Sequence, residues 1–410
     1  MNPQAPFDLS PLASMMLVAV LLAALPLAWV AWRKRGGTHI GRVHALTLLT
    51  LFLTFDLVLF GAFTRLSDSG LGCPDWPGCY GNASPSGAAA SIASAETAMP
   101  SGPVTQRKAW VEMIHRYLAT GVGVLIMLLA ASSWLAPRRP IAERLNAPRP
   151  RSLASQAGHG LYSSRWWATA TLVWVCVQGA FGALTVTMKL FPAIVTLHLL
   201  GGLLLLVLLT VQVLRQGLAA APALIEPVKP SIKIFIWLAF AALVLQIALG
   251  GWVSTNYAVL ACNEFPRCQG AWWPLMDFDQ GFQIWRQLGL TQHGDHIGFA
   301  ALTAIHYTHR IMAGVVMLML GALAWRLNAI DGLRPQSRWL AALLGLQLAT
   351  GLSNVVLDWP LLAALMHTGG AAALILVMTW LAFICGQAPA FSPQRNTAPG
   401  ARLTELRPKA

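Results

Sequence analysis

Long apolar stretches, separated by short polar connections, recur along the whole chain. An α-helix rises 1.5 Å per residue, so about 20 apolar residues cross the roughly 30 Å hydrocarbon core of a bilayer. Nine stretches have this length, near residues 11–32, 43–66, 110–135, 166–188, 193–214, 232–254, 299–325, 338–357 and 360–386. The pattern therefore predicts an all-α integral membrane protein with about nine transmembrane helices.

The composition supports a membrane location. Hydrophobic residues make up 56% of the 410 residues and charged residues only 10%, which is too little polar surface for a water-soluble globule of this size. The net charge of +13 comes largely from basic residues in the connections between apolar stretches. Such clusters indicate membrane topology, so we predict no nucleic-acid partner.

The basic connections also predict which side of the membrane each loop faces, because loops rich in Lys and Arg stay in the cytoplasm. The basic residues are Arg33, Lys34, Arg35 and Arg42; Arg138, Arg139, Arg144, Arg149, Arg151 and Arg165; Arg326, Arg334 and Arg338; and, in the tail, Arg395, Arg402, Arg407 and Lys409. Nine crossings place all of them on one side, with the C-terminus cytoplasmic and the N-terminus outside. With no cleavable signal or Arg-rich transit peptide evident, we expect a multi-pass protein of the bacterial plasma (inner) membrane.

Two parts of the sequence resemble each other. The string FGAF (60–63) leads into one C-x5-C loop, and LGGW (249–252) leads into a second loop in the same register. The loop cysteines are Cys73 and Cys79 in the first case, Cys262 and Cys268 in the second. In addition, Gln178 precedes His198 by twenty residues, as Gln347 precedes His367. The chain is therefore predicted to form two pseudo-symmetric four-helix transmembrane bundles from an internal repeat, plus one extra N-terminal helix.

The repeat predicts the domain boundaries. They are an extra N-terminal transmembrane helix with a basic cytoplasmic loop (1–42), an N-terminal four-helix half (43–220), a cytoplasmic linker (221–232), a C-terminal four-helix half (233–386) and a cytoplasmic tail (387–410). The outer loop after Gly81 contains an Ala/Ser/Gly-rich stretch, for which we expect disorder.

Each half carries two histidines on separate membrane helices. They are His115 and His198 in the first half, His309 and His367 in the second. A histidine in a membrane helix is costly and needs a partner. Because the two histidines of each half fall at similar predicted depths, they can be the axial ligands of one haem iron.

Charged residues accompany the histidines. Arg116 and Arg310 directly follow two of them, and a guanidinium suits a haem propionate. Glu112 lies three residues before His115, on the same helix face, and so shares that pocket. The second half has His306 at the corresponding position, which predicts chemically unequal sites. His306 is also an alternative iron ligand to His309, although the repeat favours His309.

The cysteine loops face the oxidising side in the predicted topology, where disulfides persist. The spacing allows the disulfides Cys73–Cys79 and Cys262–Cys268, either as structural staples or, for Cys73 and Cys79, as a redox-active pair. Cys176 and Cys385 lie within apolar stretches and are predicted to be packing residues. A metal site made by His293, Asp295 and His296 is a further alternative to a plain polar loop.

Together these motifs resemble the haem A synthase family, over about residues 43–386. The motifs are GLGCPDWPGC (70–79), EMIHR (112–116), IHYTHR (305–310) and the helices of His198 and His367. The resemblance implies that His115 and His198 hold the substrate haem O, that Glu112 assists the chemistry, and that His309 and His367 ligate a permanent haem b. It also implies the reaction: successive hydroxylations of one porphyrin methyl group, followed by loss of water to leave the formyl group of haem A, which serves terminal oxidases.

The chain differs from the family pattern in having an extra N-terminal helix before eight core helices, and both halves retain a cysteine pair. Partners implied by the resemblance are lipid, a haem O synthase and an electron donor, and a homo-oligomer is left open. Two other functions remain: a di-haem b-type electron-transfer protein, and a haem-free membrane thiol/quinone oxidoreductase that uses the outer-loop cysteines. A transporter is disfavoured, because broken helices are not evident.

Overall fold

The structure is a computed structural model that describes residues 7–8, 11–135, 165–220 and 228–387. The arginines predicted to be cytoplasmic between 138 and 151 lie outside the described residues, as do most of the predicted linker (221–232) and nearly all of the predicted tail (387–410).

Nine helices of the described part are long and apolar enough to cross a membrane, which confirms the predicted all-α membrane architecture. Their bounds are α1 Leu12–Arg33, α2 His39–Leu66, α4 Gln106–Leu135, α7 Arg165–Thr187, α8 Pro192–Ala220, α9 Pro230–Thr255, α11 Phe299–Asn328, α12 Arg334–Val356 and α13 Leu361–Gln387. The helices extend the predicted apolar stretches by a few residues at several ends, because polar residues at the membrane boundary continue the same helical hydrogen bonding.

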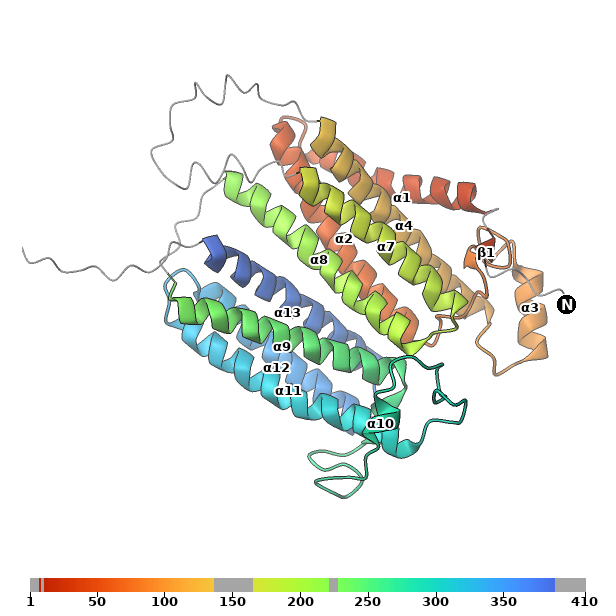
Figure 1. The fold of residues 1–410 in the computed structure, drawn as a ribbon. Coiled ribbons are helices and arrows are strands. Elements are labelled where there is room, and N and C mark those ends of the chain that lie inside the picture. Colours follow the sequence, from red (N-terminus) through yellow and green to blue (C-terminus); the bar gives the residue numbers. More distant parts are fainter. Residues whose placement is uncertain (1–6, 9–10, 136–164, 221–227, 388–410) are drawn as a thin grey trace, which may run out of the picture.

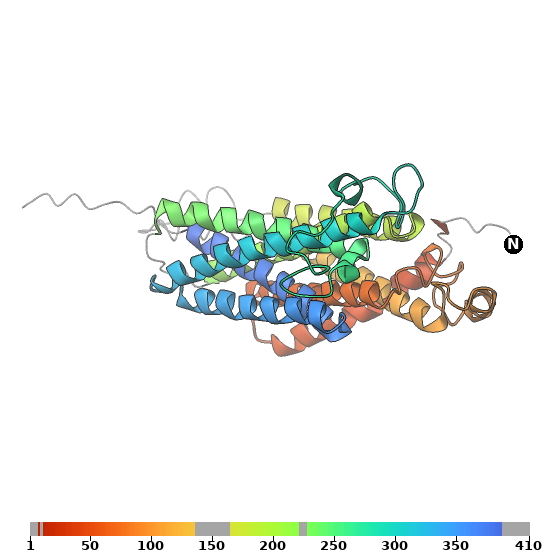
Figure 2. The ribbon, with the colours of Figure 1, turned by 90° about the horizontal axis from the view of Figure 1, so that it is seen from below.

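Eight of these helices form two four-membered groups, drawn in red to light green and in green to blue (Figure 1). The first group is a closed ring of contacting neighbours, α2, α4, α7 and α8; the second is the ring α9, α11, α12 and α13. The groups meet where α8 packs on α9 and α13, and α13 packs on α2. In Figure 2 the helices of both groups run roughly parallel to one another. Each group therefore surrounds its own interior, although a common origin of the two groups stays a prediction.

The extra helix α1 packs on α4 and α2, outside the ring. Its buried face carries Ala19 and Ala23, and it passes close to Gly121 of α4. Small residues allow such close helix packing in membranes. The opposite face exposes large apolar side chains, among them Leu21 and Leu25, as expected for a lipid-facing peripheral helix.

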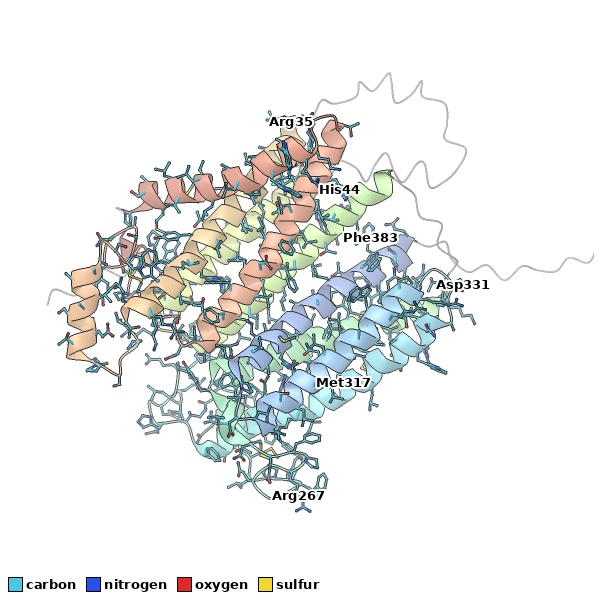
Figure 3. All side chains as sticks on the ribbon, turned by 180° about the vertical axis from the view of Figure 1, so that it is seen from behind. Arg35, His44, Arg267, Met317, Asp331 and Phe383 are labelled. Atoms are coloured by element: carbon cyan, nitrogen blue, oxygen red, sulfur yellow. A yellow bond between two sulfur atoms is a disulfide. The ribbon has the colours of Figure 1, made fainter. Side chains whose placement is uncertain are left out.

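The connections lie at two opposite ends of the helices. Arg35 and Asp331 lie toward one end, whereas Arg267 of the second cysteine loop lies at the other (Figure 3). The cysteine-loop end also carries short elements: β1 (Phe7–Asp8) paired in parallel with β2 (Trp76–Pro77), α3 (Ala89–Ala98), the 3-10 helix η1 (Ala258–Ala261) and α10 (Phe278–Gly281). The expected disorder after Gly81 is wrong for α3, where a run of helix-forming alanines folds and buries Ile92.

Polar contacts join the two groups at the cysteine-loop end. Arg65 donates to the Ser254 carbonyl oxygen (2.5 Å) and lies over the Tyr257 ring, 4.1 Å from its centroid. The Tyr257 hydroxyl donates in turn to Asp68 (2.7 Å). Deeper in the bundle, buried side chains such as Leu206 of α8 and Met378 of α13 belong to one shared apolar core. The groups therefore sit in a fixed relation to each other.

Candidate functional site

His115 in α4 and His309 in α11 each lie against a glycine of the preceding transmembrane helix. A Cβ atom at Gly61 would lie 3.0 Å from His115 Cε1, and one at Gly250 would lie 2.9 Å from His309 Cε1. Both distances are tighter than ordinary van der Waals contact, so a larger residue at either position would require the imidazole to shift. The glycines therefore provide the space that each imidazole occupies.

The other two predicted ligands have the same kind of neighbour. A Cβ atom at Gly182 would lie 3.5 Å from His198 Cε1, and one at Gly351 would lie 3.2 Å from His367 Cε1. The sequence interpretation missed these four glycines. The available signal was their matched position: the second residue of FGAF and of LGGW, and the fourth residue after Gln178 and after Gln347.

The four histidines form one pair in each group. His115 and His198 are close enough to interact electrostatically, and so are His309 and His367. All four are partly buried between helices. The Nδ1 atoms of His115 and His198 are buried without a hydrogen-bond partner in the described part of the chain. Two nearby imidazoles on neighbouring helices, with nitrogens free of hydrogen bonds to the described residues, have the chemistry of a pair of iron ligands.

We expect Gly61→Ala to lower the haem content of the first group. The added methyl would lie 3.0 Å from His115 Cε1, so the ring must shift by a few tenths of an ångström, and overpacking of this kind costs about 1–3 kcal/mol. The haem content per chain, measured spectroscopically on purified protein, checks the effect. Gly179→Ala in α7 is the matched control, because a Cβ atom there meets nothing within 4 Å. Equal haem content in both variants would contradict the assigned role of Gly61.

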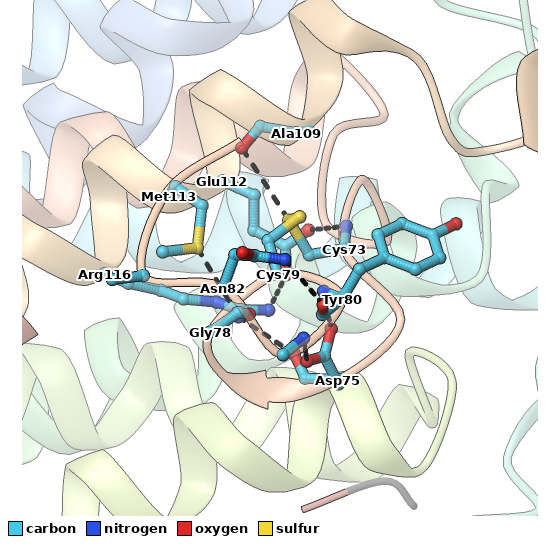
Figure 4. Close-up of a disulfide and its surroundings, with 12 residues drawn as sticks. Cys73, Asp75, Gly78, Cys79, Tyr80, Asn82, Ala109, Glu112, Met113 and Arg116 are labelled. Atoms are coloured by element: carbon cyan, nitrogen blue, oxygen red, sulfur yellow. Dashed lines mark hydrogen bonds and ion pairs between the residues drawn. A yellow bond between two sulfur atoms is a disulfide. The ribbon is translucent and has the colours of Figure 1, made fainter. Parts of the chain in front are cut away.

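Arg116 fastens the first cysteine loop to α4 (Figure 4). Its Nη1 donates to the carbonyl oxygens of Asp75 (2.9 Å), Pro77 (3.1 Å) and Gly78. The loop is closed by Cys73 and Cys79, whose sulfur atoms lie 2.08 Å apart. The guanidinium is thus buried in contacts with the protein, and its predicted interaction with a haem propionate stays a prediction.

Arg310 holds the second cysteine loop in the same way. Its Nη1 donates to the carbonyl oxygens of Glu264 (2.8 Å) and Arg267 (3.2 Å), and its Nη2 donates to that of Cys262 (2.7 Å). Cys262 and Cys268 are also at disulfide distance, with sulfur atoms 1.93 Å apart. In both groups, therefore, the arginine beside a candidate ligand anchors a closed cysteine loop.

Glu112 also holds the first cysteine loop to α4, together with Arg116. One carboxylate oxygen accepts from Arg116 Nη2 (2.5 Å), and the other accepts from the backbone N–H of Cys73 (2.8 Å). Glu112 and Arg116 are both buried. A buried carboxylate is stabilised when a cation and backbone donors surround it. These contacts therefore stabilise the Glu112 carboxylate and at the same time hold the cysteine loop on α4.

His306 takes the place of Glu112 in the second group. Its Nδ1 lies 3.1 Å from the Ala258 carbonyl oxygen, and its Nε2 lies 3.3 Å from Arg310 Nε. Both ring nitrogens therefore have partners within the protein. These contacts disfavour the alternative in which His306 replaces His309 as an iron ligand, and they make the surroundings of the two histidine pairs unequal.

Asp75 shapes the first cysteine loop from within. Its carboxylate accepts from the backbone N–H groups of Tyr80 (2.6 Å) and Gly81 (2.8 Å). Burial and the nearby Asp75 carboxylate raise the pKa of the Tyr80 phenol above its usual range. The phenol therefore stays neutral at physiological pH.

The remaining sequence candidates do not join these sites. The described residues contain no cluster of three or more His, Cys, Asp or Glu side chains that could hold a metal ion, which disfavours the alternative at His293, Asp295 and His296. Cys385 is buried in the apolar core, as expected for a packing residue. Cys176 is exposed on α7, so its predicted packing role is wrong.

In each group, an arginine that directly follows a histidine anchors a closed cysteine loop, and a second histidine lies on a neighbouring transmembrane helix. These features characterise a class of multi-pass membrane protein with two similar histidine sites. The comparisons with known proteins agree with this class. Residues 44–379 match the model of the cytochrome oxidase assembly protein family COX15-CtaA, and the chain belongs to this family.

Curated relatives extend the match over most of the chain. The chain is 36% identical to Heme A synthase of Shewanella oneidensis over 334 residues, which is 80% of this chain and 92% of the relative. It is 28% identical to Heme A synthase of Symbiobacterium thermophilum, over 83% and 95% of the two chains. It is 26% identical to that of Halalkalibacterium halodurans, over 80% and 91%. Helix α1 precedes the region that the family model matches.

Proposed function

We propose that the chain is a haem A synthase, an oxidoreductase that converts haem O to haem A for terminal oxidases. The observation that carries the proposal is the pair of glycine-backed histidines in each helix group of a chain from this family. In the proposed reaction, one porphyrin methyl group of haem O is hydroxylated successively and loses water to give a formyl group.

We propose that the two sites have different tasks. His115 and His198 hold the substrate haem O, whereas His309 and His367 ligate a resident haem b. The residues present suit this group, since each pair offers imidazole nitrogens in a glycine-lined space between apolar helices. When bound, haem b supplies one-electron transfer to the substrate site.

The chain's own residues bind and orient the substrate. The ion pair of Glu112 and Arg116 holds the first cysteine loop next to His115. All three side chains come from one short segment of α4, which fixes their positions relative to one another. Glu112 is the titratable group one turn from the ligand, so we propose that it stabilises positive charge or moves a proton during the oxidation. Arg116 and Arg310 are proposed to meet the haem propionates with N–H groups not used by the loops.

We also propose an orientation in the membrane. The cysteine loops face the periplasm, and the connections with Arg35 and Asp331, like the C-terminus, face the cytoplasm. The opposite placement of Arg35 and Arg267 along the helices supports this arrangement, as does the excess of basic residues at the Arg35 end. An electron donor and a haem O synthase are the proposed partners.

The activity is tested by expressing the chain in membranes that supply haem O but make no haem A. Extracted haems are identified by mass spectrometry. The proposal predicts haem A, or its hydroxylated precursor, only when the chain is present. Unchanged haem O with co-purifying haem B would favour the electron-transfer function instead, and a colourless protein would favour a thiol oxidoreductase.

Cys73→Ser tests whether the first cysteine pair takes part in the chemistry. The loop is also held by Arg116, Glu112 and Asp75, so we expect the variant to fold and to retain haem. If Cys73 and Cys79 carry electrons or bind substrate, haem A output falls at least about tenfold, whereas Cys262→Ser leaves most of it. Full output from Cys73→Ser would make the pair a structural staple only.

A further inference from the structure

The two histidine pairs differ in what holds their rings. His309 Nδ1 lies 3.0 Å from the side-chain amide of Gln246, and His367 Nδ1 lies 3.0 Å from Thr350 Oγ1. In the first group, by contrast, Nδ1 of His115 and Nδ1 of His198 are buried and lack a hydrogen-bond partner among the described residues. Within the described part of the chain, hydrogen bonds to the ring nitrogens of the candidate ligands are therefore confined to the second group.

The difference traces to two positions in the sequence. Gln246 lies four residues before Gly250, where the first half has Leu57 before Gly61. Thr350 directly precedes Gly351, where the first half has Phe181 before Gly182. At each position a polar side chain in the second half corresponds to an apolar one in the first. Because the flanking glycines contact the histidine rings in both halves, these positions are structurally comparable.

Thr350 lies where its hydroxyl favours one tautomer of His367. The Thr350 hydroxyl donates its single proton to the Leu346 carbonyl oxygen at 2.7 Å, within its own helix. When the hydroxyl donates to that carbonyl oxygen, it can only accept toward His367 at 3.0 Å, and this arrangement favours the imidazole proton on Nδ1. The lone pair is left on Nε2, the nitrogen that would face an iron ion. This tautomer is the form in which the imidazole would bind iron.

Gln246 restrains the partner ligand. Its Nε2 lies 3.0 Å from His309 Nδ1 and also donates to the His309 carbonyl oxygen at 3.2 Å. With the amide nitrogen in this position, His309 Nδ1 accepts; a 180° rotation of the amide would offer Oε1 to an Nδ1–H at the expense of the hydrogen bond to the His309 carbonyl oxygen. The contact therefore limits the orientation of the His309 ring.

We propose that Gln246 and Thr350 are positioning residues that make the second site retain its haem, and that Leu57 and Phe181 leave the first site able to release its porphyrin. This inference rests on the proposed function, in which one site keeps a cofactor and the other exchanges substrate and product. Preset ligands lose less freedom on binding, which favours retention. A hydrogen bond from Nδ1–H also makes the imidazole a stronger ligand and stabilises ferric iron.

The test uses the full-length protein purified from membranes without a haem O supply. Thr350→Val removes the hydroxyl, and Thr350→Ser keeps it. The rate of haem B transfer to apomyoglobin and the midpoint potential of the bound haem are measured. We expect Thr350→Val to release haem about 10-fold to 100-fold faster and to raise the midpoint potential, and Thr350→Ser to resemble the wild type.

Thr379→Val is the matched control, because Thr379 is a buried threonine of α13 that donates to Ile375 in the same way but contacts no histidine. Phe181→Thr is the converse variant, and it should slow the release of haem O from the first site. Unchanged release and potential in Thr350→Val, or equal changes in Thr379→Val, would overturn the inference. Absence of haem B from the wild-type protein would instead contradict the proposed function, so the two failures are distinguishable.

Discussion

Replacing His115 by Ala is expected to abolish haem A formation while haem B stays in the protein. The substitution removes one of two ligands from the first site and leaves the second ring of helices untouched. Removing a residue that only hydrogen-bonds a metal ligand typically lowers metal affinity or activity about 10-fold to 100-fold. Removing the ligand itself should therefore lower haem A output more than about 100-fold. Mass spectrometry of extracted haems, together with the optical spectrum of the purified protein, measures both effects.

His293→Ala serves as the control for this variant, since His293 is exposed in a loop outside both sites. It should leave haem A output and haem B content at wild-type levels. The assignment fails if His115→Ala still makes haem A, or if it loses haem B while His309→Ala keeps it.

Glu112→Ala is expected to destabilise the protein as well as inactivate it. The variant leaves the buried Arg116 guanidinium without its counter-charge and the Cys73 N–H without its acceptor. Removing one partner of a buried ion pair costs about 3–5 kcal/mol. Thermal unfolding in detergent should therefore shift to a lower temperature, with haem A output lost.

Two further variants separate the structural role of Glu112 from its chemical role. Glu112→Gln keeps the side-chain shape and one of the two acceptor oxygens, and Glu112→His copies the His306–Arg310 contact of the second group. Both should fold better than Glu112→Ala and retain haem O. If the carboxylate takes part in the oxidation, both still fail to make haem A; normal haem A output from Glu112→Gln would limit Glu112 to holding the loop.

Much of the fold follows from simple physical rules. Apolar stretches long enough to span a bilayer have few alternatives to the helix, because every backbone group must be satisfied internally. The predicted stretches accordingly fall on the nine long helices. The sequence did not reveal α3, because alanine-rich segments outside a membrane are compatible with helix or disorder, and burial of Ile92 decides between them.

The site was predictable only in part. Histidines in apolar helices stand out, since such residues are rare and costly there. The partners of Arg116 did not stand out, because carbonyl oxygens from a loop nearly forty residues earlier in the chain have no sequence signature. The polar neighbours of the second histidine pair were missed for a similar reason. Gln246 and Thr350 look like ordinary polar residues of a membrane helix until the helices are placed side by side.

The central claim is that the two histidine pairs hold different haems for different tasks. The most direct test is the identity and amount of haem per chain in purified wild type, His115→Ala and His309→Ala, each prepared with and without a haem O supply. We expect wild type to contain haem B under both conditions, and haem O or haem A only with the supply. His115→Ala should lose haem O and haem A, and His309→Ala should lose haem B. Loss of both haems together from either variant in a folded protein, or the reverse assignment of the two sites, would contradict this claim.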